Sequence, residues 1–302
     1  MEDKPFKCLL CDNDDNRELV SSTLRDDSSG KIQVFRCLTC GHVQLFPIPA
    51  QDENLSFYRA DGLALDLFEQ VDVESIKQSS ECDTKRRAEW VYRKNRNHGK
   101  ILDIGCGYGF FVDRLTKMGL DVTGMDIGTE RLNWAKQNLA GSFIEGQLND
   151  EYTKAHPNRY HVITMFHMLE HVQKPHALLK TCMSLLIPKG RLLIEVPNVY
   201  DELIKKNEEY NNFYWQHAHL SYFDYARLEL LFRRSGCENF SIAGLQRFGI
   251  RNLIHWIDTG KPQLTKAEFI YEEPALKRLE LLYSEDKEKT LMCDTLIAEI
   301  IN

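Results

Sequence analysis

The sequence lacks long apolar runs, an excess of positive charge and any strong bias in composition. None of its apolar stretches approaches the ~18 residues of a membrane-spanning helix, and its first residues, MEDKPFKCLL, do not follow the pattern of a secretory signal. Its 45 Asp and Glu residues outnumber its 38 Lys and Arg residues, which gives a net charge of −7. We therefore expect a folded cytoplasmic protein without a membrane span, whose overall charge does not attract nucleic acid.

Cysteine, in contrast, is abundant, with nine residues in the chain. Four of them form two Cys-x-x-Cys pairs, Cys8 with Cys11 and Cys37 with Cys40, and the other five are scattered singly. A tight turn of this spacing directs two thiolates toward one ion, and two such turns complete a tetrahedral site, so we predict that these four residues bind a structural Zn²⁺. Two disulfides, or thiols without a partner, are the alternatives that the spacing leaves open.

The chain divides into three predicted parts: a zinc ribbon (1–47), a helical arm or linker (48–98) and a main domain (99–302). In the arm, the sequence pattern predicts a helix from Thr84 to Asn97, with Trp90 facing inward. Its basic side chains are expected to face mostly outward: Lys85, Arg86, Arg87, Arg93, Lys94 and Arg96. Such a run of charge is usually a solvated face, and contact with an anionic substrate is the alternative. Tyr58 either packs the arm against the main domain or contacts the substrate.

A glycine-rich turn follows an apolar run in KILDIGCGYGFF, residues 100–111. This pattern predicts a buried strand, a tight turn and the start of a helix. The glycines allow a ligand to approach the backbone, and the helix start offers free N–H groups. A second apolar run ends at Asp126, about twenty residues after the turn, where a carboxylate can accept both hydroxyls of a ribose.

Strand and helix patterns alternate through the rest of the main domain. Further strands are predicted at 121–128, 142–146, 160–168, 191–198, 240–246 and 295–300, and helices at 129–138, 174–190 and 225–235. Such alternation predicts an α/β fold with a doubly wound, mostly parallel sheet, whose ligands bind beyond the carboxyl ends of the strands.

The motifs DIGCGYG, LEHV and IPKGRLLIEVPN, with the acidic end of the second strand, resemble those of class I S-adenosylmethionine-dependent methyltransferases. The resemblance implies a seven-stranded, Rossmann-like methyltransferase fold and an enzyme that uses S-adenosyl-L-methionine. It also implies that Asp103 and the backbone of Gly105, Cys106 and Gly107 hold the amino-acid end of this methyl donor, and that Asp126 binds its ribose.

The same resemblance assigns the rest of the donor site. It implies that Ile127 packs on the adenine and that Gln147 and Leu148 lie at its polar edge. It implies further that Phe166 and His167 close the sulfonium side. Methyl transfer is an in-line displacement, so alignment and partial desolvation are expected to provide most of the rate.

Residues 211–224, NNFYWQHAHLSYFD, are dense in histidine and aromatic residues. The aromatic side chains can belong to the core, with His217 and His219 held by backbone carbonyls. A histidine beside the methyl donor is also a natural general base for a hydroxyl or an acidic carbon. A metal-binding histidine pair is a third interpretation, although no carboxylate is spaced along the segment to complete such a site.

The ribbon, the arm, the H-x-H-L-S-Y-F segment and the tail LQRFGIRNLIHWIDTGKP together resemble bacterial sugar methyltransferases, including nucleotide-sugar C-methyltransferases of deoxysugar and surface-polysaccharide pathways. The resemblance implies a sugar or nucleotide-sugar acceptor, with His219 as the general base, His217 as the second candidate and Tyr58 on the substrate side. In the C-methylating members the middle residue of H-x-H is Glu, whereas here it is Ala218. Because C-methylation removes a proton next to a keto group, the missing carboxylate favours O-methylation.

Three other functions compete with this interpretation. A dinucleotide dehydrogenase is disfavoured, because its fingerprint is G-x-G-x-x-G and the turn here is G-x-G-x-G. A zinc-ribbon rRNA methyltransferase should have a basic ribbon, whereas Met1–Ala50 has six Lys and Arg residues against eight Asp and Glu residues, so nucleic acid is not the expected partner. A non-catalytic interaction protein with a methyltransferase fold would not need the glycine turn and Asp126.

Overall fold

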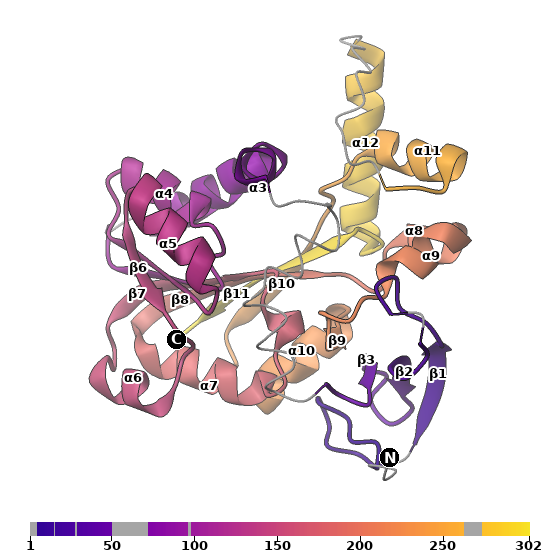
Figure 1. The fold of residues 1–302 in the computed structure, drawn as a ribbon, viewed down its shortest axis with the longest axis horizontal. Coiled ribbons are helices and arrows are strands. Elements are labelled where there is room, and N and C mark those ends of the chain that lie inside the picture. Colours follow the sequence, from indigo (N-terminus) through magenta and orange to yellow (C-terminus); the bar gives the residue numbers. More distant parts are fainter. Residues whose placement is uncertain (1–4, 15, 28, 50–71, 96–97, 263–273) are drawn as a thin grey trace.

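The structure is a computed structural model that describes residues 5–14, 16–27, 29–49, 72–95, 98–262 and 274–302. Tyr58, the predicted substrate-side residue of the arm, lies outside these ranges. Within them, the chain forms one large mixed sheet flanked by helices and one small antiparallel sheet beside it (Figure 1).

Among the described residues, seven strands form the large sheet: β4 (Ile101–Ile104), β5 (Val122–Asp126), β6 (Ser142–Glu145), β7 (Tyr160–Phe166), β8 (Leu186–Pro197), β10 (Phe240–Leu245) and β11 (Thr295–Ile301). Their order across the sheet is β10-β11-β8-β7-β4-β5-β6. The strands from β6 to β8 are parallel, and β11 and β10 are antiparallel additions at one edge. The predicted seven-stranded, Rossmann-like α/β fold is confirmed.

Helices cover both faces of this sheet (Figure 1). One face carries α3 (Val73–Lys94), α4 (Phe110–Lys117) and α5 (Thr129–Asn138), and the other carries α6 (Asp150–Ala155), α7 (Pro175–Leu185) and α10 (Tyr225–Arg234). The sequence of β4 shows why, because Ile101 belongs to the core cluster on one face while Leu102 and Ile104 belong to the cluster on the other. A strand that is buried on both faces must be apolar throughout.

The small sheet joins the N-terminal ribbon to the histidine-rich segment of the main domain. It pairs β1 (Arg17–Ser21), β2 (Gln33–Cys37) and β3 (Val43–Phe46) with β9 (Ser221–Tyr222), a short strand of the histidine-rich segment. Val43 pairs with Tyr222 and Gln44 with Ser221. The four-cysteine ribbon is therefore hydrogen-bonded to the main domain at the segment that carries the candidate base.

Several predicted boundaries differ from those of the structure. The arm helix begins at Val73 instead of Thr84, because the Asp72 side chain accepts the N–H of Glu74 and caps it there. The predicted helix over 174–190 ends at Leu185 and β8 begins at Leu186, ahead of Pro188, which a helix interior does not accept.

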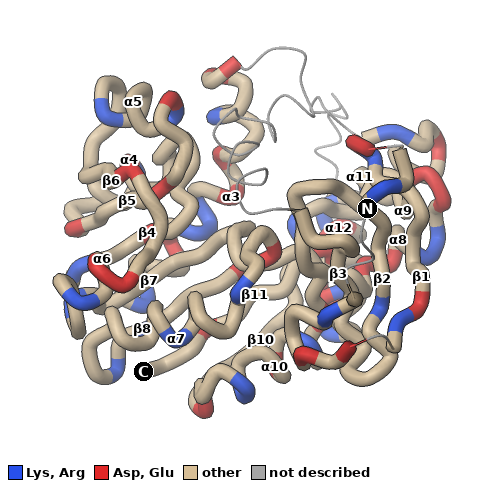
Figure 2. The backbone as a smooth tube through the Cα atoms, turned by 60° about the horizontal axis from the view of Figure 1, so that its bottom comes forward, with Lys and Arg blue, Asp and Glu red and all other residues tan. Residues whose placement is uncertain are grey.

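The remaining helical elements are η1 (Leu169–His171), α8 (Glu202–Lys206), α9 (Glu208–Tyr214), α11 (Ile250–Thr259) and α12 (Pro274–Thr290). No helix within the described ranges is both long enough and apolar enough to cross a membrane. Acidic and basic residues alternate along the backbone, so the view in Figure 2 shows no extended face of one charge.

Candidate functional site

The glycine-rich turn between β4 and α4 has an open surface. Gly105, Gly107 and Gly109 adopt left-handed backbone conformations, with φ of 78°, 54° and 77°. The N–H groups of Gly105 and Cys106 donate to the carbonyl oxygen of Met125 at 2.8 and 3.2 Å, which ties the turn to β5. A Cβ atom added at Gly107 would meet no other atom within 4 Å. The turn is therefore open to a ligand at Gly107, whereas Met168 and Phe143 lie against Gly105 and Gly109.

Asp126 closes the turn from the end of β5. Its carboxylate accepts the N–H of Gly107 at 2.9 Å and that of Gly128 at 2.8 Å, and it forms an ion pair with Arg131 at 3.0 Å. In β4, Asp103 accepts a hydrogen bond from Thr164 at 2.6 Å, and burial raises the pKa of its carboxyl to about 6. Both acids lie at the turn, as the sequence predicts, and the ribose contact of Asp126 stays a prediction.

The other predicted donor residues follow the carboxyl ends of neighbouring strands. Ile127 comes directly after β5, and the exposed Gln147 and the half-buried Leu148 come after β6. Phe166 ends β7 and packs edge-on against Phe111 with the ring centroids 5.3 Å apart. Because β4, β5, β6 and β7 are parallel neighbours, these residues share one edge of the sheet with the glycine turn.

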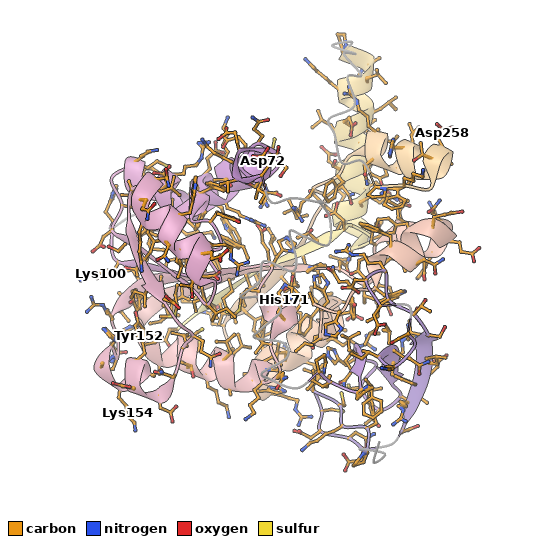
Figure 3. All side chains as sticks on the ribbon, in the orientation of Figure 1. Asp72, Lys100, Tyr152, Lys154, His171 and Asp258 are labelled. Atoms are coloured by element: carbon orange, nitrogen blue, oxygen red, sulfur yellow. The ribbon has the colours of Figure 1, made fainter. Side chains whose placement is uncertain are left out.

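Glu170, in the LEHV motif after β7, lies among three histidines. Its Oε1 atom is 3.5 Å from Nδ1 of His167, 3.8 Å from Nε2 of His171 and 4.0 Å from Nε2 of His219. Figure 3 shows His171 near the middle of the molecule, between the large sheet and the ribbon. Spacing along the 211–224 segment offers no carboxylate for its histidines, and the fold brings Glu170 to one of them, His219, from another part of the chain.

Glu170 and His219 are buried and His171 is partly buried, and burial shifts the pKa of each toward its neutral form. Glu170 is 1% exposed, and neither of its carboxyl oxygens has a hydrogen-bond partner among the described residues. Burial raises the pKa of Glu170 to about 8, lowers that of His171 to about 4 and holds that of His219 well below its usual value. Their ligand atoms lie within 4.8 Å of one another, so the group has the donor set of a metal site as well as that of an acid–base site.

Hydrogen bonds fix the orientation of both imidazoles. Nδ1 of His171 donates to the carbonyl oxygen of Ala218 at 2.8 Å, so its unprotonated Nε2 faces Glu170. The amide nitrogen of Gln216 lies 3.1 Å from Nε2 of His219, and Oε1 of Gln216 accepts a hydrogen bond from Arg25 at 2.7 Å. A ribbon residue therefore helps to hold the candidate base.

His217, the second candidate base, lies in a different environment. Its backbone N–H donates to both carboxylate oxygens of Asp26, at 2.9 and 3.0 Å. His217 does not belong to the group of Glu170, His171 and His219. Trp215, Tyr222 and Phe223 of the same segment are at most 2% exposed, so these aromatic residues are core, as one of the alternatives held.

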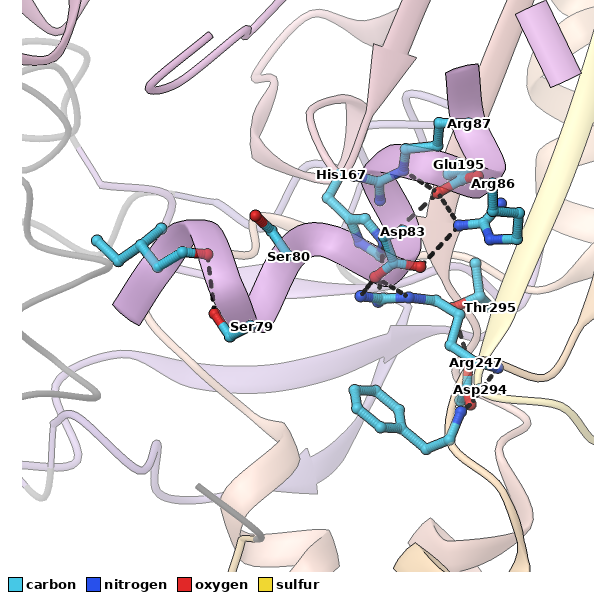
Figure 4. Close-up of polar contacts among 12 residues, drawn as sticks. Ser79, Ser80, Asp83, Arg86, Arg87, His167, Glu195, Arg247, Asp294 and Thr295 are labelled. Carbon is cyan, nitrogen blue, oxygen red and sulfur yellow. Dashed lines mark hydrogen bonds and ion pairs between the residues drawn. The ribbon is translucent and has the colours of Figure 1, made fainter. Parts of the chain in front are cut away.

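A network of ion pairs extends from His167 to the arm helix (Figure 4). Nε2 of His167 lies 3.0 Å from Arg247, and Arg247 donates to Asp83 of α3 at 3.0 Å. Glu195 of β8 is fully buried and accepts hydrogen bonds from Arg86 at 2.6 Å and Arg87 at 2.8 Å.

The expectation that the basic residues of the arm helix face mostly outward was wrong for Arg86 and Arg87, which turn inward to Glu195. Asp83, Glu195 and Arg247 were not predicted as part of the site. The sequence signal that could have indicated this network is the glutamate in the apolar run RLLIEVPN, because a buried carboxylate requires a positive partner.

The two Cys-x-x-Cys pairs converge, which confirms the predicted four-cysteine cluster. Sγ of Cys8 is 3.6 Å from that of Cys40, and Sγ of Cys11 is 3.7 Å from that of Cys37. All four sulfur atoms lie within 4.8 Å of one another, and none forms a disulfide. A tetrahedral zinc ion with Zn–S bonds of ~2.3 Å requires sulfur atoms ~3.8 Å apart, so the cluster fits Zn²⁺.

The sequence is similar to those of known methyltransferases. Curated relatives include the ubiquinone biosynthesis O-methyltransferase of Pectobacterium carotovorum subsp. carotovorum (strain PC1), which is 33% identical over 118 residues, or 37% of this chain and 47% of the relative. The protein of the same name from Klebsiella pneumoniae (strain 342) is 35% identical over 103 residues, or 33% of this chain and 43% of the relative. The chain thus spans about half the length of the curated relatives it matches.

Solved structures share the fold. A SAM-dependent methyltransferase from Archaeoglobus fulgidus superposes with a TM-score of 0.50 at 19% identity, over 74% of this chain and 94% of that chain. Magnesium protoporphyrin IX methyltransferase from Synechocystis PCC 6803, solved with bound SAH, gives a TM-score of 0.50 at 15% identity, over 84% of this chain and 100% of that chain. Residues 78–242, more than half of the sequence, match the family model described as a methyltransferase domain. The chain therefore belongs to the methyltransferase-domain family, the family that its motifs predict.

Proposed function

We propose that this protein transfers a methyl group from S-adenosyl-L-methionine to a hydroxyl oxygen of a small polar acceptor, a sugar or nucleotide sugar. Membership of the methyltransferase-domain family supports the reaction. The curated relatives named above are O-methyltransferases, which supports oxygen as the acceptor atom. The sugar class rests on the resemblance of the ribbon, arm and H-x-H-L-S-Y-F segment to sugar methyltransferases.

The proposed donor site is the open surface over the glycine turn. When bound, S-adenosyl-L-methionine supplies a methyl group on a positively charged sulfur. Asp103, Cys106 and the glycines of the turn bind its amino-acid end, and Asp126 binds its ribose. Ile127, Gln147 and Leu148 surround its adenine. Phe166 and His167 bound the transfer site, where packing of Phe166 on Phe111 excludes water from one side.

The group of Glu170, His171 and His219 is the observation that carries the acceptor half of the proposal. It lies beside His167, on the predicted sulfonium side of the donor site. His219 acts as the general base, because burial keeps its imidazole neutral and able to take a proton. His217 is the second candidate for this role, and Tyr58 is proposed to contact the acceptor.

The charge of this group favours a hydroxyl over a carbon acceptor. Ala218 places no carboxylate beside His219, and Glu170, which does lie beside it, is neutral at pH 7 because its pKa is raised to about 8. Removal of a proton from carbon would need a negatively charged carboxylate beside His219. A hydroxyl proton leaves as the new oxygen–carbon bond forms, so a neutral imidazole is sufficient.

We also propose that the four-cysteine cluster holds a structural Zn²⁺. Four thiolates leave no open coordination position, so the ion has no part in the reaction. Its ligands Cys37 and Cys40 flank the turn that leads into β3, and β3 pairs with β9 next to His219. The ion would therefore stabilise the sheet that positions the candidate base.

The proposal is tested by incubating the purified protein and S-adenosyl-L-methionine with a panel of nucleotide sugars, free sugars and phenols. We expect one methyl group to appear on a sugar, with an NMR shift typical of a methyl group on oxygen. Transfer to phenols alone would reject the acceptor class while retaining the methyltransferase. A methyl group on carbon would reject the choice of oxygen, and a donor that does not bind would reject the reaction.

A further inference from the structure

A second concave site lies at the opposite edge of the large sheet. It is a cavity of about 640 Å³ bounded by the end of α3, the start of β7 and the turn at the start of β8. These are the amino-terminal ends of β7 and β8, whereas the glycine turn and Glu170 follow carboxyl ends of parallel strands. A molecule in this cavity would lie at the other end of the strands from the donor site.

The cavity is rich in positive charge, although the chain as a whole has a net charge of −7. Its lining includes Arg93, Lys94, Lys189 and Arg191. Lys94 and Arg191 share a single carboxylate, that of Glu299. The ion pairs among the described residues give Arg93 and Lys189 no acidic partner. The lining therefore has four positive charges against the one negative charge of Glu299, an excess of three.

His161 lies in one wall of the cavity and is partly exposed. Its Nδ1 atom is buried, away from the open space, and has no hydrogen-bond partner within the described parts of the chain. The ring lies directly against Gly99, where a Cβ atom would come within 2.0 Å of the imidazole, so only glycine permits this position. A ligand in the cavity can therefore meet only the exposed part of the imidazole.

The rest of the lining is Asn95, Ile187, Pro188 and Gly190, of which Ile187 and Pro188 are apolar. Ile187 and Pro188 face the cavity beside the cations, and its volume lies within the range of about 300–1,000 Å³ typical of small-molecule sites. A bare phosphate ion would occupy only a small part of this space. Cations for an anionic group beside apolar residues for a flat ring match the parts of a nucleotide.

We propose that this cavity binds a phosphorylated small molecule of the nucleotide type, at a site separate from that of methyl transfer. Arg93 and Lys189 bind its phosphates, since neither is held by a carboxylate of the described chain. Ile187 and Pro188 pack against its ring, with the partly exposed imidazole of His161 in the same lining. The proposal does not depend on the proposed methyl acceptor, because it concerns binding alone.

Calorimetry on the full chain tests this site with UDP, ADP, pyrophosphate and unphosphorylated uridine as probes. We expect the two nucleoside diphosphates to bind best, pyrophosphate to bind more weakly and uridine not to bind. The double variant Arg93→Ala/Lys189→Ala should weaken diphosphate binding roughly tenfold or more, about 1.4 kcal/mol. Lys154→Ala/Lys180→Ala removes two exposed charges elsewhere and should leave the affinity unchanged.

A second titration, with the donor site saturated by S-adenosylhomocysteine, separates the two sites. Diphosphate affinity should be unchanged in its presence. Displacement by S-adenosylhomocysteine, equal affinity of the Arg93→Ala/Lys189→Ala variant and the wild type, or no diphosphate binding at low salt would each overturn the proposal. A melting curve of each variant shows whether a loss of affinity arises from unfolding. None of these results depends on turnover, so failure here leaves the proposed methyl transfer untouched.

Discussion

Oε1 of Glu170 lies 4.0 Å from Nε2 of His219, and both residues are buried. The two residues come from different sheets of the fold, since Glu170 follows β7 of the large sheet and His219 precedes β9 of the small one. Their contact joins the predicted donor side to the predicted acceptor side.

His219→Ala is expected to lower kcat by about 10²- to 10⁴-fold, the usual effect of removing a general base. The dissociation constant of S-adenosyl-L-methionine should stay within about twofold of the wild-type value, because the donor residues lie on the large sheet. Steady-state kinetics and calorimetry measure the two effects. His217→Ala is the matched control and should retain most activity. If His217→Ala removes turnover and His219→Ala does not, His217 is the base.

Glu170→Gln is expected to change how stability depends on pH. The folded pKa of Glu170, about 8, lies above its ordinary value of 4.5, so the folded protein holds this proton more tightly than the unfolded chain. Its contribution to stability is therefore present below about pH 4.5 and is lost as the pH rises to about 8. Between these values the melting temperature of the wild type should fall more than that of Glu170→Gln. Parallel curves would show that Glu170 is ionised in the folded protein.

Asp126→Asn is expected to weaken binding of S-adenosyl-L-methionine by about 10- to 100-fold, the value of a hydrogen bond to a charged group. The substitution keeps the size of the side chain, but an amide has one acceptor oxygen, so it can accept only one of the N–H groups of Gly107 and Gly128. Asp121→Asn, at the exposed start of the same strand segment, is the control. Calorimetry that finds equal donor affinity for all three proteins would remove the ribose assignment.

Glu195→Gln is expected to lower the free energy of unfolding by about 3–5 kcal/mol, because Arg86 and Arg87 would lose the partner of their buried charge. Glu229→Gln is the control, since its ion pair with Arg233 is exposed and should contribute about 0–1 kcal/mol. Urea denaturation at neutral pH compares the two. Equal losses would show that the pairs at Glu195 do not anchor α3.

Cys40→Ser is expected to remove bound zinc, of which the wild type should hold about one ion per chain, a complete four-thiolate site. Turnover should fall as well, because the ribbon sheet supports the segment with His219. Cys82→Ser changes an exposed cysteine outside the cluster and should keep both metal and activity. Mass spectrometry under native conditions counts the metal. An unchanged zinc content in Cys40→Ser would reject the site.

The sequence was sufficient to predict the features that depend on local spacing. The glycine turn, Asp126 and the Cys-x-x-Cys pairs each appear within a few residues of one another or at a fixed distance along the chain. The Glu170 group could not be found in this way, because its contacts depend on how two sheets pack. Arg86 and Arg87 were assigned to the surface for the same reason, since their partner Glu195 is more than a hundred residues away in the sequence.

The pairing of β3 with β9 also has a consequence for the order of folding. Residues Val43–Phe46 leave the ribosome long before Ser221 and Tyr222, so one edge of the ribbon sheet has no strand to pair with until most of the chain has been made. An unpaired strand edge is prone to bind other chains. Zinc bound early would stabilise the ribbon until β9 has been synthesised. Cells grown without zinc should therefore yield aggregated protein instead of soluble, inactive protein.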